Sequence, residues 1–395
     1  MARLDTSGYY ALGVPMYLIL AAADVYIAHR RGGRTYRFGD TLSNLSAGLG
    51  EVVIGLFLGP LLIALYDWAF AHFALIHWRE NSPESWIVAF LLADLGYYVY
   101  HRAGHSVAVL FAVHGVHHQS EQFNLTLAMR HPWFSDFYSA PFYAALPLLG
   151  IPPLQFFVAI SLISFYALTV HTMSFRRPGA FLLVTPQTHI VHHCRNPRYI
   201  GRNLGAMFTL WDRLFGTHVE IIPQDPPDLG TPTGYRTHSG ARAQWIFFRD
   251  LIETARRATT LKDRLRVFFG RPGWRPPGVT VAREPPARAD AVIPRATKLH
   301  AAGQFTATSL LSIYILWLRD RHSLPVQIVA AALILWSLGT IGALLDGLAG
   351  AEAGERRRLI VSAIVAAGAA IWMPQYRMAG MVLAGVWAVG IALWR

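Results

Sequence analysis

The histidines of this sequence stand out by their number and by their spacing. The chain has 17 of them, and nine that lie between positions 101 and 193 fall into four groups. Two groups share the pattern HxxHH, one reads HRAGH, and one is a single histidine. The nine residues are His101, His105, His114, His117, His118, His171, His189, His192 and His193.

This spacing predicts a metal centre. Positions i, i+3 and i+4 of an α-helix share one face, so each group is expected to project two or three imidazoles in one direction. The two HxxHH groups predict a site with approximate twofold likeness. One ion commonly takes about four to six ligands, so nine imidazoles predict two metals. Without metal, crowded neutral imidazoles would compete for few hydrogen-bond acceptors, and protonated ones would repel one another.

Imidazole ligands leave the identity of the metal open, since zinc, copper, iron and nickel all accept them. A zinc hydrolase would normally add a carboxylate as general base, and the only acid within a helical turn of a group is Glu121. At a lipid boundary the available substrates carry unactivated C–H bonds, which yield to iron and O2. We therefore expect two iron ions with O2 as co-substrate. A zinc-dependent membrane lipid hydrolase and, less favoured, a metal transporter are the alternatives from other classes.

The composition places these histidines in a membrane protein. Hydrophobic residues make up 53% of the chain and charged residues only 15%, whereas soluble domains carry about 25% charged residues. The net charge of +12 accompanies 12 Trp and 22 Phe, which argues against nucleic acid and for an anionic lipid surface as partner. The single cysteine, Cys194, excludes an intramolecular disulfide, a CxxC pair and a thiolate-held cluster.

Apolar runs approaching the length of about 20 residues that spans a bilayer must position the histidine groups. We expect an all-α, multi-span integral membrane protein with a cytoplasmic histidine-rich helical cap over the catalytic transmembrane helices and a C-terminal transmembrane bundle. Residues 137–149 and 154–170 are predicted to form a hairpin that dips in and returns. The remaining runs are 9–27, 50–73, 86–100, 305–318, 326–345, 359–372 and 378–393.

Positive charge orients the expected spans. Four arginines between positions 30 and 37 follow the first run, so that loop is predicted to be cytoplasmic. Counting spans from there puts the histidine groups on the cytoplasmic side. More than half of the 35 basic residues lie in 176–298, which predicts a cytoplasmic segment lying against anionic lipid. The expected regions are 1–80 with N-terminal transmembrane helices, 81–222 with the catalytic domain, 223–299 with a basic segment and linker, and 300–395 with the C-terminal bundle.

Further motifs accompany the histidines. They are DLGYYVYHR at 94–102, Asn124, AMR at 128–130, TP at 185–186, Asn203 and WDRLFGT at 211–217. With them, the sequence resembles the fatty acid hydroxylase/sterol desaturase superfamily of membrane di-iron enzymes. DRL at 263–265, FGRPGW at 269–274 and the C-terminal bundle are similar to its alkylglycerol monooxygenase branch.

The resemblance implies an O2-dependent hydroxylation of the carbon next to the ether oxygen of glyceryl ethers, after which the product falls apart to an aldehyde and a glycerol compound. Another fatty acid or sterol-type hydroxylase or desaturase is the alternative. The nine histidines would be the metal ligands. Tetrahydrobiopterin, or another external reductant or reductase, would supply electrons, and Ser106 stands where animal members have a glutamate. Ala167 and Phe175 occupy places where some relatives have a further histidine, so water, another polar group or His131 would complete the ligands.

Several polar side chains near these groups are expected to orient the ligands or to bind a lipid headgroup. Asp94 lies seven residues, about two helical turns, before His101, so it is expected to accept a proton from a ligand imidazole. Asn124 and Arg130 are expected to do similar work or to bind a headgroup. Asp212 and Arg213 are expected to lock their turn under the site, and Cys194 to be a bystander. The aromatic residues Tyr97, Tyr98 and Tyr100 are expected to line a substrate tunnel or to form an interfacial belt.

Overall fold

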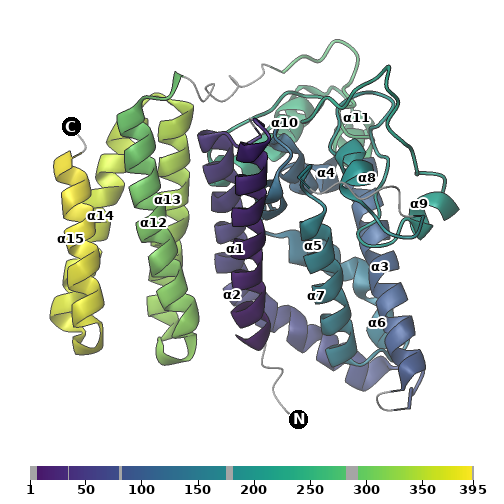
Figure 1. Ribbon diagram of the computed structural model, residues 1–395, viewed down its shortest axis with the longest axis horizontal. Helices are drawn as coiled ribbons and strands as arrows, with labels where there is room; N and C mark the ends of the chain where they lie inside the picture. The colour runs from purple at the N-terminus through teal and green to yellow at the C-terminus, as the bar shows by residue number, and fades with distance from the viewer. Residues whose placement is uncertain (1–6, 34, 80–81, 175–180, 282–291, 394–395) are drawn as a thin grey trace.

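A long apolar helix, α2 (Phe38–Phe73), runs through the middle of the computed structural model (Figure 1). The structure describes residues 7–33, 35–79, 82–174, 181–281 and 292–393. Within these ranges the chain forms helices, turns and two isolated bridges, without a strand. The predicted all-α class is therefore confirmed.

The helices around α2 pack into one apolar core. They are α3 (Pro83–Ser106), α5 (Ser135–Tyr143), α6 (Ala145–Leu148) and α7 (Pro153–Thr169). The first helix, α1 (Ser7–Arg30), contacts the chain elsewhere, because the hydroxyl of Tyr17 donates to the carbonyl of Leu125 at 3.3 Å. Ala93 on α3, Tyr143 on α5 and Ile163 on α7 are buried in this core. The run expected as a hairpin thus divides into α5, α6 and α7, and prolines fix the starting φ of α7.

Two helices among the described residues are long and apolar enough to cross a membrane, α2 and α13 (Leu324–Asp346). The apolar helix α7 is shorter. Large apolar side chains on α2, such as Leu61 and Leu65, are about half exposed, which suits contact with lipid better than contact with water.

A cap of short helices lies at one end of α3 (Figure 1). It contains α4 (Ala108–His114), η1 (His117–Gln119), η2 (Leu125–Met129), α8 (Pro186–His192), α9 (Leu210–Leu214), α10 (Gly240–Arg257) and α11 (Leu261–Phe269). Helix α10 is amphipathic, because Phe247 and Leu251 are buried against α4 while arginines occupy its other face. The cap therefore closes over the ends of the helices that carry histidines.

The C-terminal bundle packs directly on α2. It contains α12 (Arg295–Trp317), η4 (Arg319–Arg321), α13, α14 (Ala351–Trp372), η5 (Pro374–Tyr376) and α15 (Arg377–Leu393). Val53 and Leu56 of α2 share a buried core with Ile334 and Leu338 of α13. Of the region 223–299, predicted to hold a basic segment and linker, residues 282–291 lie outside the described residues, and residues 271–281 form turns and irregular chain.

Candidate metal centre

The structure brings all nine predicted ligands together in two groups. Within each group the candidate ligand atoms lie within 4.8 Å of one another. The five-histidine group consists of His101, His105, His114, His118 and His192. The four-histidine group consists of His117, His171, His189 and His193.

The two HxxHH motifs, residues 114–118 and 189–193, are called the first and second box. Each box contributes to both the five-histidine and the four-histidine group. The outer pair His114 and His118 belongs to the five-histidine group, whereas His117 belongs to the four-histidine group. In the second box the assignment is reversed, because residues 189 and 193 enter the four-histidine group and His192 enters the other. The approximate twofold likeness is therefore present. The expectation that each box projects two or three imidazoles in one direction holds for the outer pair of each box, whereas the third histidine enters the other group.

The first box also does not lie on one α-helix, which corrects a second expectation. Helix α4 ends at His114, the chain turns at Gly115, and His117 begins the 3-10 helix η1. A Cβ at Gly115 would lie 2.8 Å from the carbonyl oxygen of Phe111 and 2.9 Å from the ring of Phe247. The missing side chain therefore lets the chain tighten at the point where the box divides.

Local structure fixes the other ligands. His101 and His105 are one turn apart at the end of α3. The second box lies on α8, which begins with a capping box between Thr185 and Thr188 and has proline at its first position. His171 follows the end of α7 by two residues. Four separate elements therefore converge on one centre.

Backbone carbonyls set the tautomer of four imidazoles. Each of the four donates its Nδ1–H to a carbonyl oxygen, so in the neutral ring Nε2 holds an unprotonated lone pair. The bonds run from His101 to Leu204 at 2.7 Å, His117 to Arg130 at 3.2 Å, His171 to Ala167 at 2.9 Å and His192 to Arg202 at 3.1 Å.

These tautomers leave lone pairs facing one another. The Nε2 atoms of His117 and His171 lie 3.1 Å apart, and neither carries a proton to share. Burial, reinforced by the neighbouring imidazoles, lowers the pKa of His117 well below its usual value, so protonation does not relieve the repulsion. The buried Nε2 atoms of His105 and His192 have no hydrogen-bond partner among the described residues. One cation in each group would satisfy these nitrogens, and the residues present therefore fit a metal in each group.

Comparison with known proteins shows which families this chain is similar to. Residues 86–217 match the family model described as fatty acid hydroxylase. The chain is 29% identical to alkylglycerol monooxygenase of Danio rerio over 371 residues, which cover 89% of this chain and 81% of that protein. It is 30% identical to alkylglycerol monooxygenase of Xenopus tropicalis over 69% of this chain and 61% of that protein.

The matched range 86–217 therefore resembles the fatty acid hydroxylase family, and it contains all nine histidines of the two groups. The chain is an oxidoreductase of the oxygenase class, as predicted. Ornithine lipid hydroxylase OlsE of Rhizobium tropici is 26% identical over 49% of this chain and 62% of that protein. No solved structure matches the chain significantly.

Asp212 supports the oxygenase centre through a backbone carbonyl. Its buried carboxylate accepts hydrogen bonds from the amides of Leu204 and Gly205, both at 2.8 Å, and from the hydroxyl of Thr217 at 2.7 Å. The carbonyl of Leu204 in turn receives the Nδ1 proton of His101. Asp212 therefore does more than lock its own turn, because it fixes the acceptor that orients a ligand.

Asp94 has other hydrogen-bond partners than predicted. Its oxygens accept hydrogen bonds from the amide of Met207 at 3.1 Å and from the indole of Trp211 at 2.8 Å. His101 donates to a carbonyl instead, as described above. The expected bond from Asp94 to a ligand imidazole is therefore absent among the described contacts. Two helical turns of separation placed both residues on one face, but the side chain of Asp94 points toward the Met207 loop.

Arg130 is fully buried, and all five of its N–H donors are engaged. The acceptors are the carbonyl oxygens of Val116 and Thr237 and the side chains of Ser43, Asn44 and Gln119. Its own carbonyl accepts the proton of His117. These bonds favour the supporting role for Arg130 over headgroup binding. Asn124 caps η2 at Thr126 and donates to the carbonyl of Thr35.

Asp24 is a functional candidate that sequence reasoning missed. The hydroxyls of Tyr36 and Thr172 donate to its buried carboxylate, and the amide of Leu125 donates at 3.1 Å. Thr172 directly follows the ligand His171. The available signal was an acid inside a predicted membrane span, a position that usually marks function.

Several predicted candidates lie outside the two groups. The ring of His131 lies 5.8 Å from that of His117, and its Nδ1 faces Glu51 at 3.2 Å. Ala167 offers only its carbonyl, and Phe175 lies outside the described residues. The thiol of Cys194 points back to the carbonyl of Ile190, and burial raises its pKa to about 12.

The tyrosines before His101 and the serine after His105 also contact specific partners. The ring of Tyr97 lies 5.5 Å from that of His101, while the hydroxyl of Tyr98 bonds to Thr217 at 2.9 Å. Ser106 donates to the carbonyl of Arg102 within its own helix. Tyr97 is thus the tyrosine of this run that touches the centre.

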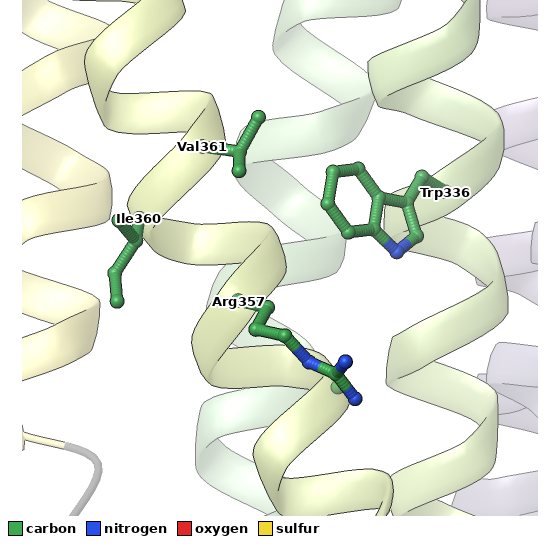
Figure 2. Close-up of a pocket in the computed structure, with 5 residues that line it drawn as sticks. Trp336, Arg357, Ile360 and Val361 are labelled. Atoms are coloured by element: carbon green, nitrogen blue, oxygen red, sulfur yellow. The ribbon is translucent and has the colours of Figure 1, made fainter.

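Figure 2 shows a cavity in the C-terminal bundle. It has a volume of about 460 Å³ between α13 and α14 of the C-terminal bundle. Its lining residues are Trp336, Gly354, Arg357, Ile360 and Val361. No histidine is among them, so this cavity is not the oxygenase centre.

Proposed function

We propose that this chain is a membrane-bound non-haem di-iron monooxygenase that hydroxylates the alkyl chain of an ether lipid. The observation that carries the proposal is the division of nine histidines into groups of five and four. Within them, Nε2 lone pairs face one another with no proton between. Each group fits one metal ion.

Iron is favoured over zinc because the described groups contain histidine alone. Glu121, the one acid near a box, forms ion pairs with Arg195 at 3.4 Å and with Arg236. A zinc hydrolase would lack its general base there. Bound iron supplies the electrons that activate O2 for attack on an unactivated C–H bond. The protein supplies ligands of fixed orientation and a buried, dry surrounding.

The ether-lipid substrate is inferred from the alkylglycerol monooxygenase relatives. One oxygen atom of O2 would enter the carbon next to the ether oxygen, and the other would leave as water. This step consumes two electrons and two protons from an external donor, tetrahydrobiopterin or a reductase. The resulting hemiacetal breaks its C–O bond to give an aldehyde and a free hydroxyl on the glycerol side.

We further propose that the chain crosses the membrane several times, with the metal centre on the cytoplasmic side and the regions bounded as predicted. The helices α2 and α13 and the basic cap support this arrangement. In a Cys194→Ser background, a cysteine at Thr280 should react with maleimide only from the cytoplasm, and one at Ser323 only from the opposite side. Labelling of both from one side would contradict the topology.

The function is tested by metal content and oxygen dependence. Purified protein should contain about two irons, and glyceryl ether cleavage should stop without O2. His117→Ala and His192→Ala should abolish turnover. His72→Ala is the matched control, because that exposed imidazole bonds only to the carbonyl of Trp68 among the described contacts. Anaerobic turnover would indicate the hydrolase, and hydroxylated acyl chains with intact ethers would indicate the fatty acid-type hydroxylase.

A further inference from the structure

Asp346 is a buried acid at the last position of α13, in the C-terminal bundle. A negative charge is unfavourable at a helix C-terminus, so its position needs another reason. Its carboxylate accepts hydrogen bonds from the hydroxyl of Thr237 and from the amide of His238 at 2.8 Å, and Arg242 lies at 3.5 Å. All three partners belong to the cap and none to the bundle.

Thr237 links Asp346 to Arg130, which contacts the ligand His117. Its carbonyl oxygen accepts hydrogen bonds from the guanidinium of Arg130 and from the hydroxyl of Ser43, both at 3.2 Å. Thr237 and Arg130 are both almost fully buried, so water does not compete for these bonds. The side chain and the carbonyl of Thr237 thus join the bundle to Arg130.

Arg130 holds the ligand His117 from two sides. Its carbonyl accepts the Nδ1 proton of His117, which fixes the tautomer and the tilt of the ring. Its guanidinium donates to the carbonyl of Val116, the residue before the ligand, at 2.8 Å. A shift of the guanidinium therefore moves both the backbone and the acceptor of His117.

Close backbone packing accompanies the hydrogen bonds. A Cβ at Gly342 of α13 would lie 2.1 Å from the Cα of Ser239. A Cβ at Gly240 would lie 3.0 Å from the amide nitrogen of Ala47 on α2. The backbones of α13, residues 239–240 and α2 are therefore in direct contact, and α13 cannot move without displacing the segment after Thr237.

We propose that Asp346 is a positioning residue for the metal centre, acting through Thr237 and Arg130 on His117. The C-terminal bundle then contributes to the four-histidine group instead of serving as a separate membrane anchor. This inference rests on the proposed metal site, and it predicts an effect on one of the two metals.

The test measures metal binding of the full-length protein by chelator competition. Asp346→Ala should weaken retention of one metal of the two about tenfold, at the lower end of effects seen for residues that support ligands. Asp346→Asn keeps the shape and one acceptor, and should give a smaller change. With cobalt as the probe, the absorption of one bound ion should change and that of the other should stay.

The matched control is Glu355→Gln, in the same bundle. Glu355 is as buried as Asp346, but its hydrogen-bond partners His300, Thr340 and Arg358 all lie within the bundle. This variant should lower thermal stability without moving the chelator midpoint. If Glu355→Gln and the Asp346 variants shift the midpoint equally, the effect is general loosening and the proposal is overturned.

Thr237→Val tests the route. It removes the hydroxyl that donates to Asp346, so it should reproduce the loss seen in Asp346→Asn, and the double variant should be no worse than the more affected single variant. Additive losses, or a folded Asp346→Asn protein with the wild-type midpoint and cobalt spectrum, would overturn the inference. Wild-type protein that retains no metal would instead refute the proposed function on which the inference rests.

Discussion

Replacing Asp212 by asparagine should loosen the metal of the five-histidine group. The carboxylate accepts three hydrogen bonds, two at one oxygen from Leu204 and Thr217 and one at the other from Gly205. In the Asn variant the single carbonyl oxygen can keep the first two. Its amide then faces the N–H of Gly205, a donor against a donor.

The loss of free energy in the Asn variant follows from this mismatch of two donors. One bond to a charged acceptor is lost and one buried N–H is left unpaired, which together cost about 1–3 kcal/mol. Residue Gly205 has little room to move, because a Cβ built there would lie 2.5 Å from the carbonyl oxygen of Phe208 and 3.0 Å from the carboxylate. The loop carrying Leu204 therefore shifts, and the acceptor of His101 shifts with it. Metal retention in this group should fall about 10–100-fold.

The assay is chelator competition with the metal counted per protein. At intermediate chelator the Asp212→Asn protein should hold one metal where wild type holds two. Asp225→Asn is the control, because Asp225 accepts from Asn196 at 2.5 Å in a loop without a ligand contact. A folded Asp212→Asn protein with lowered thermal stability and an unchanged chelator midpoint would refute the reasoning.

The remaining predictions concern the same centre. His105→Ala and His189→Ala should each leave about one metal per protein, since they belong to different groups; loss of both metals in either would show a single shared site. The only cysteine, Cys194, should resist maleimide at pH 8 in the folded protein and react after unfolding, because burial raises its pKa to about 12. Metal-free protein should lose stability as the pH falls from about 7 to 5: buried imidazoles such as His118 have lowered pKa values, so only the unfolded chain takes up protons near 6.5. A thermal melting temperature that is flat over this range would contradict that prediction.

The ligands could be predicted from the sequence because their pattern is local. Spacings such as HxxHH follow from helix geometry and need no knowledge of distant contacts. The hydrogen-bond partners that orient these ligands could not be predicted in the same way. His101 and His117 bond to backbone carbonyls of Leu204 and Arg130, and every residue has a carbonyl, so no residue type marks these partners. The bond between Asp346 and Thr237 joins residues 109 positions apart, which only the packing of α13 on the cap reveals.

The error over Asp94 has the same origin. Helical spacing correctly puts Asp94 and His101 on one face of α3, but it does not decide what approaches that face. The loop at Met207 and the indole of Trp211 reach the carboxylate first. The helix face that a residue occupies follows from local geometry, whereas its hydrogen-bond partners depend on the tertiary fold.

The division of each box explains why the two histidine groups draw on two HxxHH patterns. The last two histidines of a box are neighbours in the chain and point in different directions. His117 and His118 accordingly enter different groups, as do His192 and His193. Each box is thereby shared by both groups. A displacement of either box must then alter both groups, whereas a displaced support such as Leu204 alters only the group that contains its own ligand.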